Sequence, residues 1–171
     1  MDKVKTDNLA SKITGLMEMI PGYSGYQARA TRRESDARQR EFIARRLTQL
    51  KSDLQSVQEE FLGSGKLSMM GSFEKANNRL DRVIERVRHA SHGYAGFFDS
   101  VQINEAELDR IYEYDLSLLN IVASAEEALM AVRGAADGAA DPQVALRSLV
   151  AKIDEFDRAL SERDGILKGI K

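Results

Sequence analysis

The sequence predicts an all-α protein, folded as an antiparallel bundle of four to five helices. Apolar residues recur three and four positions apart along most of the chain, which is the period of an amphipathic helix. Only 2 of the 171 residues are proline and 30% are charged, a composition typical of helix-rich globular proteins. No stretch alternates apolar and polar residues convincingly enough to predict a strand. At this length we expect a single helical-bundle domain over residues 1–171.

The first two helices are predicted over residues 7–20 and 25–62. The first ends where Pro21 cannot continue a helix. Ser24 and Gln27 are spaced as a capping box at the start of the second helix. The second helix is the longest predicted element, and a heptad seam of apolar residues runs along it: Ile43, Leu47, Leu50, Leu54, Val57 and Phe61.

Three further helices are predicted over residues 72–91, 104–133 and 142–164. Asn104 and Glu107 have the spacing of a cap and its third-position partner. Asp141 can cap the last helix, with Pro142 at its favoured first position. The seam of that helix consists of Leu146, Leu149, Ile153, Phe156 and Leu160. Short connections between these helices favour antiparallel packing.

Two short segments resemble one another: Gly22-Tyr23-Ser24-Gly25-Tyr26 and Gly93-Tyr94-Ala95-Gly96-Phe97. Similar apolar positions precede both, so the pattern indicates a degenerate duplication of a helix-elbow-helix unit, over residues 7–62 and 72–133. Gly22 and Gly93 can adopt the left-handed conformation that ends a helix. The aromatic residues at these elbows either pack beneath the bundle end or form an exposed docking face: Tyr23, Tyr26, Tyr94, Phe97 and Phe98.

Two aspartates fall at core positions of the predicted seams. Heptad steps backwards from Ile43 reach Arg40, Asp36, Arg33 and Arg29, and Asp115 lies on the apolar stripe of the 104–133 helix. A buried carboxylate is costly unless it is paired. We therefore predict a buried ion-pair cluster, in which Asp115 meets an arginine of the second helix: Asp36, Asp115, Arg33 and Arg40.

A carboxylate metal site is the alternative for these residues. Ferritin-like bundles hold metal ions with carboxylates that project inward from facing helices, and the candidate ligands here are Glu34, Asp36, Glu113 and Asp115. The two Glu-x-x-His motifs of those sites are missing, so we expect no cofactor. His89 and His92 lie in the last turn of the 72–91 helix, where capping of free carbonyl groups is the favoured interpretation.

Charge is distributed unevenly although the whole chain carries only −2. Residues 29–46 contain seven arginines and three acids, a net charge of about +4, whereas residues 105–133 contain seven acids and two arginines, about −5. The two segments either neutralise each other as neighbours, or the arginines bind an anionic partner. That partner could be an acidic protein surface, anionic lipid or nucleic acid.

The sequence predicts a non-enzymatic interaction or scaffold protein. It contains no cysteine and no catalytic motif, and neither a secretory leader nor a membrane-spanning run is evident, so we expect a cytoplasmic protein. The expected partner is a protein, a second copy of this chain included. The expected contact region combines arginine and aromatic residues, as interface hot spots do: Tyr23, Tyr26, Arg29, Arg32, Arg33, Tyr94, Phe97 and Phe98.

Overall fold

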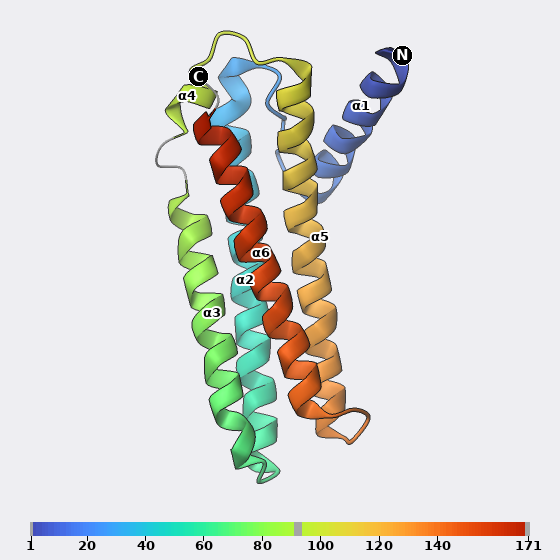
Figure 1. The fold of residues 1–171 in the computed structure, drawn as a ribbon, viewed down its shortest axis with the longest axis vertical. Helices are drawn as coiled ribbons and strands as arrows, with labels where there is room; N and C mark the ends of the chain where they lie inside the picture. The colour runs from blue at the N-terminus through green and yellow to red at the C-terminus, as the bar shows by residue number, and fades with distance from the viewer. Residues whose placement is uncertain (1, 91–93, 170–171) are drawn as a thin grey trace.

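Four long helices form the bundle in the computed structural model (Figure 1). They are α2 (Arg32–Gly63), α3 (Met70–His89), α5 (Glu105–Ala136) and α6 (Pro142–Gly169). Shorter elements are α4 (Ala95–Phe98) and the 3-10 turns η1 (Arg29–Thr31) and η2 (Leu67–Met69), and α1 (Asp2–Met19) precedes them all. The structure describes residues 2–90 and 94–169, with side chains from Leu9 onward, so the predictions for His92 and Gly93 lie outside the described residues. Within these ranges there is no strand, and the all-α prediction is confirmed.

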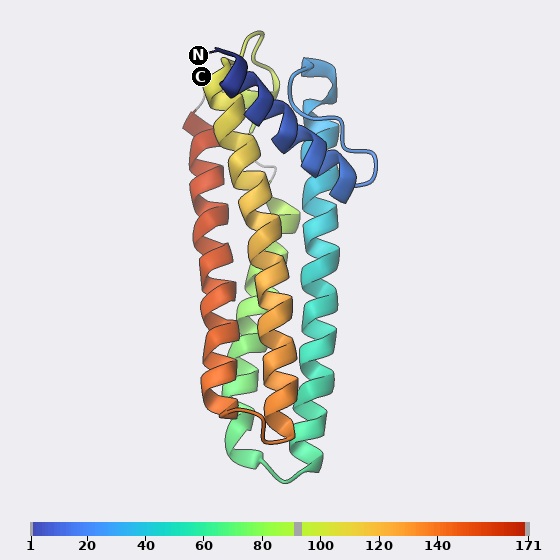
Figure 2. The ribbon, with the colours of Figure 1, turned by 90° about the vertical axis from the view of Figure 1, so that its right-hand side faces the viewer.

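The bundle consists of two helical hairpins packed side by side. α2 and α3 form one hairpin and α5 and α6 the other, while α2 also packs against α5 and α3 against α6. Helices are antiparallel within each hairpin, but α2 and α5 run in the same direction, as do α3 and α6 (Figures 1 and 2). The connection from α3 to α5 crosses the end of the bundle and contains α4. We call this the crossover end, and the opposite end, with the two hairpin turns, the distal end.

The first helix lies outside the four-helix core. α1 crosses the outer face of α5 near the crossover end (Figure 2). Leu16 and Ile20 are buried there, while Leu9 and Ile13 are only partly covered. The chain then turns back towards α2 through Gly22, whose φ of +75° is the left-handed conformation predicted for it. α1 is thus a fifth helix attached to one side of the bundle.

The predicted apolar seams form the core. All six seam residues of α2 and all five of α6 are buried, together with the apolar stripe of α5. Phe61 and Phe73 meet edge to face, with ring centroids 5.2 Å apart, where α2 and α3 approach the distal turn. Each such side chain contributes about 1.5–3 kcal/mol by leaving water.

Two of the three predicted N-terminal helix caps are confirmed. Asn104 Oδ1 accepts a hydrogen bond from the Glu107 amide (2.8 Å), and Glu107 Oε2 accepts one from the Asn104 amide (3.1 Å). Asp141 Oδ1 likewise accepts a hydrogen bond from the Gln143 amide (2.8 Å), and Pro142 is the first residue of α6. These caps depend only on residues two or three positions apart, which is why sequence spacing identifies them.

The predicted start of the second helix is wrong. α2 begins at Arg32, and Ser24 and Gln27 form no capping box. Gly25 has a φ of +79°, a conformation that no right-handed helix contains. The Ser24 amide instead donates to Ser35 Oγ (3.3 Å), and Gln27 Oε1 accepts from the Tyr112 hydroxyl (2.8 Å).

The two elbow segments have different backbones. Gly25 is left-handed, whereas Gly96, its counterpart in the sequence pattern, lies inside the helical turn of α4. The helices before them also differ, because α1 lies outside the core and α3 belongs to it. The duplication therefore stays a prediction, and the backbone conformations of Gly25 and Gly96 differ.

Candidate functional site

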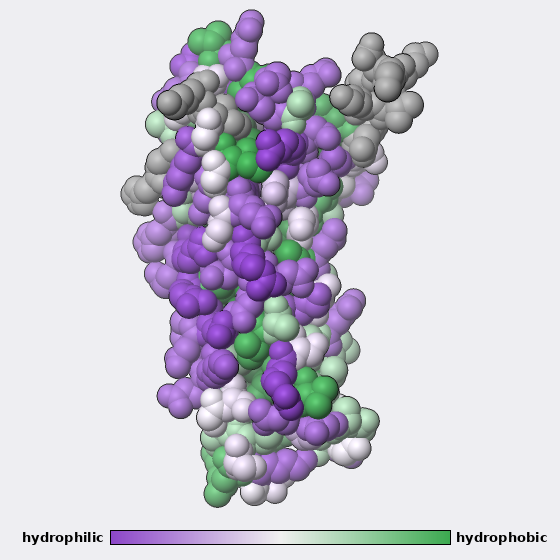
Figure 3. All heavy atoms as spheres, in the orientation of Figure 1, coloured by the Kyte–Doolittle hydropathy of each residue, from purple (hydrophilic) through white to green (hydrophobic). Residues whose placement is uncertain are grey.

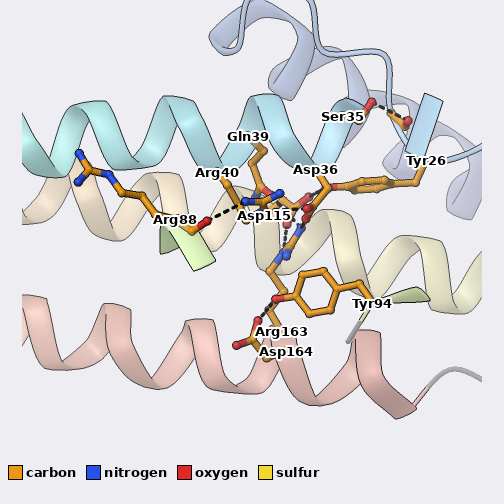
Figure 4. A network of polar contacts seen from close by, with 11 residues as sticks. Tyr26, Ser35, Asp36, Gln39, Arg40, Arg88, Tyr94, Asp115, Arg163 and Asp164 are labelled. Carbon is orange, nitrogen blue, oxygen red and sulfur yellow. Dashed lines mark hydrogen bonds and ion pairs between the residues drawn. The ribbon is translucent and has the colours of Figure 1, made fainter. Parts of the chain in front are cut away.

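A fully buried arginine is the centre of a polar network near the crossover end (Figure 4). Arg163 of α6 is 1% exposed. Its Nε donates to Asp115 Oδ1 of α5 (2.5 Å), and its Nη2 donates to Asp36 Oδ1 of α2 (2.9 Å). One guanidinium group thus joins three of the four bundle helices.

Neutral groups add further contacts between these charges, although Arg163 Nη1 and Gln39 Nε2 are buried without a hydrogen-bond partner among the described residues. Arg163 Nη2 lies 2.9 Å from Gln39 Oε1 and 3.1 Å from the Tyr26 hydroxyl. The Tyr26 hydroxyl donates to Asp115 Oδ2 (2.8 Å). We call Tyr26, Asp36, Gln39, Asp115 and Arg163 the buried polar centre.

A second arginine balances the charge of the buried polar centre. Its two aspartates and one arginine alone would carry a charge of −1. Arg40 Nε donates to the free carboxylate oxygen of Asp36 (2.7 Å), and the Arg40 side chain is 15% exposed. Two carboxylates therefore face two guanidinium groups, which lowers the cost of burying them.

Burial and ion pairing shift the pKa values of Asp115 and Arg163 in opposite directions. Burial raises the pKa of Asp115 above its usual value, while Arg163 and the Tyr26 hydroxyl oppose that rise. Burial alone would lower the pKa of Arg163, but Asp115, Tyr26 and Asp36 hold it well above the usual value. Arg163 therefore stays charged, and its removal would leave buried Asp115 without a cation.

The predicted exposed aromatic face is wrong. Tyr23, Tyr26, Tyr94, Phe97 and Phe98 are at most 4% exposed, so the alternative, packing beneath the bundle end, is what the structure shows. Tyr26 meets Phe97 edge to face at 5.7 Å, and the Tyr94 ring lies 6.0 Å from the Arg163 guanidinium carbon. The Tyr94 hydroxyl hydrogen-bonds Asp164 of α6. These rings seal the buried polar centre from solvent and leave no aromatic surface for a partner.

The buried ion pairs involve partly different residues from those predicted. Asp36 and Asp115 are buried as expected, and Arg40 pairs with Asp36, but the cation that meets Asp115 comes from α6. Arg33 instead pairs with Asp99 on the surface (2.7 Å). The reason is that an α-helix drifts by about 20° per heptad relative to a strict seven-residue repeat. The buried stripe of α2 therefore passes through Arg32, Asp36 and Gln39, and leaves Arg29 and Arg33 outside.

Arg32 has a structural role rather than the predicted surface role. It is 3% exposed, and it donates to the carbonyl oxygens of Tyr26 (2.8 Å) and Ser100 (2.7 Å). These bonds hold the segment before α2 against the segment after α4. Arg32 is thus not available to a partner.

Arg163 is the residue that the sequence prediction missed. The apolar seam of α6 contains Ile153, Phe156 and Leu160. The next position at the same spacing is Arg163, and buried Leu167 follows four residues later. Continuing that spacing would have placed a cation inside the bundle.

The four candidate metal ligands do not converge. Glu34 and Glu113 are exposed, and Glu34 pairs with Arg38 along α2. Asp36 and Asp115 are buried and bind arginines. Among the residues that the structure describes, no group of three or more histidine, aspartate or glutamate side chains could hold a metal ion.

The arginines of α2 have different partners, and Arg38, Arg40 and Arg45 lie near acids of their own helix. Arg38 pairs with Glu34 of its own helix, whereas Arg46 alone among the seven arginines of residues 29–46 pairs with an acid of α5, Glu126 (2.5 Å). Between residues 29–46 and 105–133 the expected neutralisation is thus limited to one ion pair in the described residues, and a second pair between the two helices, Arg133 with Glu60, lies farther along α2.

The distal end exposes apolar side chains. Leu62 lies in the last turn of α2, Leu67 begins η2, Met130 lies near the end of α5 and Val144 near the start of α6. These side chains are 52%, 64%, 74% and 57% exposed, in that order. Green, pale green and white surface gathers at this end on the face drawn in Figure 3. We call these four residues the distal apolar surface.

Comparison of the chain with family models, curated proteins and solved structures gives no match. No residue role is therefore transferred from another protein. None of the helices described in residues 2–90 and 94–169 is long and apolar enough to span a membrane.

Proposed function

We propose that this protein is a non-enzymatic interaction protein that binds a protein partner through the distal apolar surface. The observation that carries the proposal is the grouping of exposed apolar side chains at one end. Four of the seven large apolar side chains described as exposed belong to this surface. Contiguous apolar patches on a folded surface are typical of protein-binding sites.

The charges at the distal end favour a protein over a polyanion as the partner. Arg133 pairs with Glu60 (3.6 Å), Lys66 donates to the Ala136 carbonyl oxygen (2.7 Å), and Asp137 and Asp141 lie in the neighbouring turn, so the positive charge at this end is already compensated. The turn after α5 is rich in glycine and alanine, and small residues allow another backbone to approach closely. We expect a partner with an apolar contact face and few charges at its centre.

The inaccessibility of the buried polar centre supports a non-enzymatic role. Asp36, Asp115 and Arg163 are at most 1% exposed, and their hydrogen bonds are directed at one another. A substrate cannot contact these groups while the bundle is folded. We assign these three residues a structural role, in which they stabilise the fold and join the α2–α3 hairpin to the α5–α6 hairpin.

The test combines two charge insertions at the distal end with a matched control. Leu67→Glu with Met130→Glu places two carboxylates in the distal apolar surface, whereas Val101→Glu changes a residue that is 79% exposed between α4 and α5. Tagged protein would be used to capture partners from native cells at low and high salt. We expect capture that high salt does not weaken, that the double variant loses and that Val101→Glu retains.

Two results would overturn the proposal. One is the same partner set with the wild type and with a folded Leu67→Glu/Met130→Glu variant. The other is capture that high salt removes, since that would indicate charge-driven binding. Sedimentation of the purified protein would show whether the protein partner at this surface is a second copy of the chain.

A further inference from the structure

An arginine-lined cleft lies between α2 and α3, in the half of the bundle near the crossover end. Its volume is about 240 Å³. The lining residues are Ala37, Arg40, Glu41, Ala44, Arg45 and Arg88. The two alanines are small, and the lining contains three arginines but only one acid.

Arg40 is held in place on the inner side of the cleft. Its Nε binds buried Asp36, and its Nη1 donates to the Arg88 carbonyl oxygen at 3.3 Å (Figure 4). Its Nη2 has no hydrogen bond with the described residues. A ligand at this nitrogen would find an arginine whose side chain is already ordered, which lowers the entropic cost of binding.

The other two arginines have only long contacts. Arg45 lies 3.9 Å from Glu41, beyond hydrogen-bond distance. Arg88 lies 3.4 Å from Glu85 Oε1 and 3.5 Å from Thr48 Oγ1. The Arg45 and Arg88 side chains are 66% and 51% exposed. Their N–H groups are therefore free to turn towards an anion.

We propose that this cleft binds a phosphate group, either as the free ion or as a phosphate monoester. Guanidinium groups present paired N–H donors that match phosphate oxygens, and such charge-assisted bonds are the stronger kind. Arg40 is neutralised by Asp36, but Glu41 and Glu85 lie 3.9 Å and 3.4 Å from Arg45 and Arg88, so an anion competes only with long contacts at these two arginines. The site is independent of the distal apolar surface and adds a ligand to the proposed function.

The test measures phosphate binding directly on the purified protein. Inorganic phosphate is titrated by calorimetry and by amide chemical shifts, with chloride replacing it at the same ionic strength in the control. A parallel titration uses O-phosphoserine, because a difference between the two separates the free ion from the monoester as the ligand. We expect saturable binding of phosphate and none of chloride.

Four variants locate the site. Arg45→Gln and Arg88→Gln should each weaken phosphate binding by about ten-fold, since each removes a charged donor. Glu41→Gln should tighten binding several-fold, because it removes the carboxylate that competes with the anion. Arg38→Gln is the matched control, an exposed arginine of α2 outside the cleft, and should leave binding unchanged. Arg40 is left intact because its loss would also unpair buried Asp36.

Three outcomes would overturn the inference. They are a lack of saturable phosphate binding, equal weakening by Arg38→Gln and Arg45→Gln, and no tightening by Glu41→Gln. Binding of nucleic acid or of anionic vesicles in the absence of phosphate binding would likewise reject a monoester-sized site. None of these results depends on the protein partner of the distal end.

Discussion

Replacing Asp115 with alanine should destabilise the fold by about 3–5 kcal/mol, the range for breaking a buried ion pair. Two hydrogen bonds to the carboxylate disappear, from Arg163 Nε (2.5 Å) and from the Tyr26 hydroxyl (2.8 Å). Hydrogen bonds to charged groups contribute about 1.5–3 kcal/mol each, so the two estimates agree. Arg163 would remain charged and buried, with Asp36 as its remaining carboxylate partner.

Urea unfolding followed by circular dichroism measures this change. For a chain of this length, 1 kcal/mol shifts the thermal midpoint by about 2–4 °C, so Asp115→Ala should melt about 6–20 °C below the wild type. Glu113→Ala, an exposed carboxylate on the same helix, is the control and should stay within about 0.5 kcal/mol. If the two alanine variants unfold at the same midpoint, the buried pair does not stabilise the bundle as argued.

A triple variant separates pairing from burial. Asp36→Leu, Asp115→Leu and Arg163→Met together replace the buried charges with apolar groups. Such replacements are often neutral or stabilising by about 1–4 kcal/mol, so the triple variant should be at least as stable as the wild type. A loss as large as that of Asp115→Ala would mean that the shape of the centre, and not its charge, is what matters.

Two further predictions concern the tyrosines and the glycines. All five tyrosines have a raised pKa, chiefly through burial, and the pKa of Tyr112 is raised from the ordinary 10.0 to about 12. Folding therefore favours the neutral phenol. The resulting contribution to stability is present below pH 10 and declines as the pH rises through the pKa values of the folded state. Tyrosinate absorbance should accordingly increase together with unfolding, and titration of the buried rings near pH 10 in the intact fold would contradict this. Gly25→Ala should cost about 2 kcal/mol or more, because φ is +79° and the added Cβ would lie 2.7 Å from the Tyr112 hydroxyl. Gly71→Ala meets nothing within 4 Å inside α3 and should stabilise the protein by about 0.5–1 kcal/mol in the same urea assay; equal effects of both substitutions would refute the argument.

Much of the fold could be predicted from local patterns. The existence of α3, α5 and α6 follows from apolar spacing, and the starts of α5 and α6 follow from the Asn104 capping box and from Pro142, all of which involve residues within one or two turns of each other. The ends of α5 and α6 lie three and five residues beyond the predicted positions. The start of α2 could not be placed in this way. A turn replaces the predicted helix at Gly25, and this turn depends on Tyr112, 87 residues later. The Tyr112 hydroxyl accepts a hydrogen bond from the Tyr26 amide (2.5 Å) and so stabilises the turn.

The candidate sites were less accessible to sequence reasoning. The sequence by itself determined that Asp36 and Asp115 lie inside the bundle, because each occupies an apolar stripe. The identity of their cation was decided by tertiary structure, since Arg163 lies 48 residues beyond Asp115 and reaches it only when α6 packs between α3 and α5. Small angular drift along α2 then buries Arg32 and Gln39 in place of Arg33, a difference that the spacing of apolar residues cannot resolve over several turns. Periodicity records which face of a helix is apolar, whereas the partner of each charge is set by how the helices pair and rotate against one another.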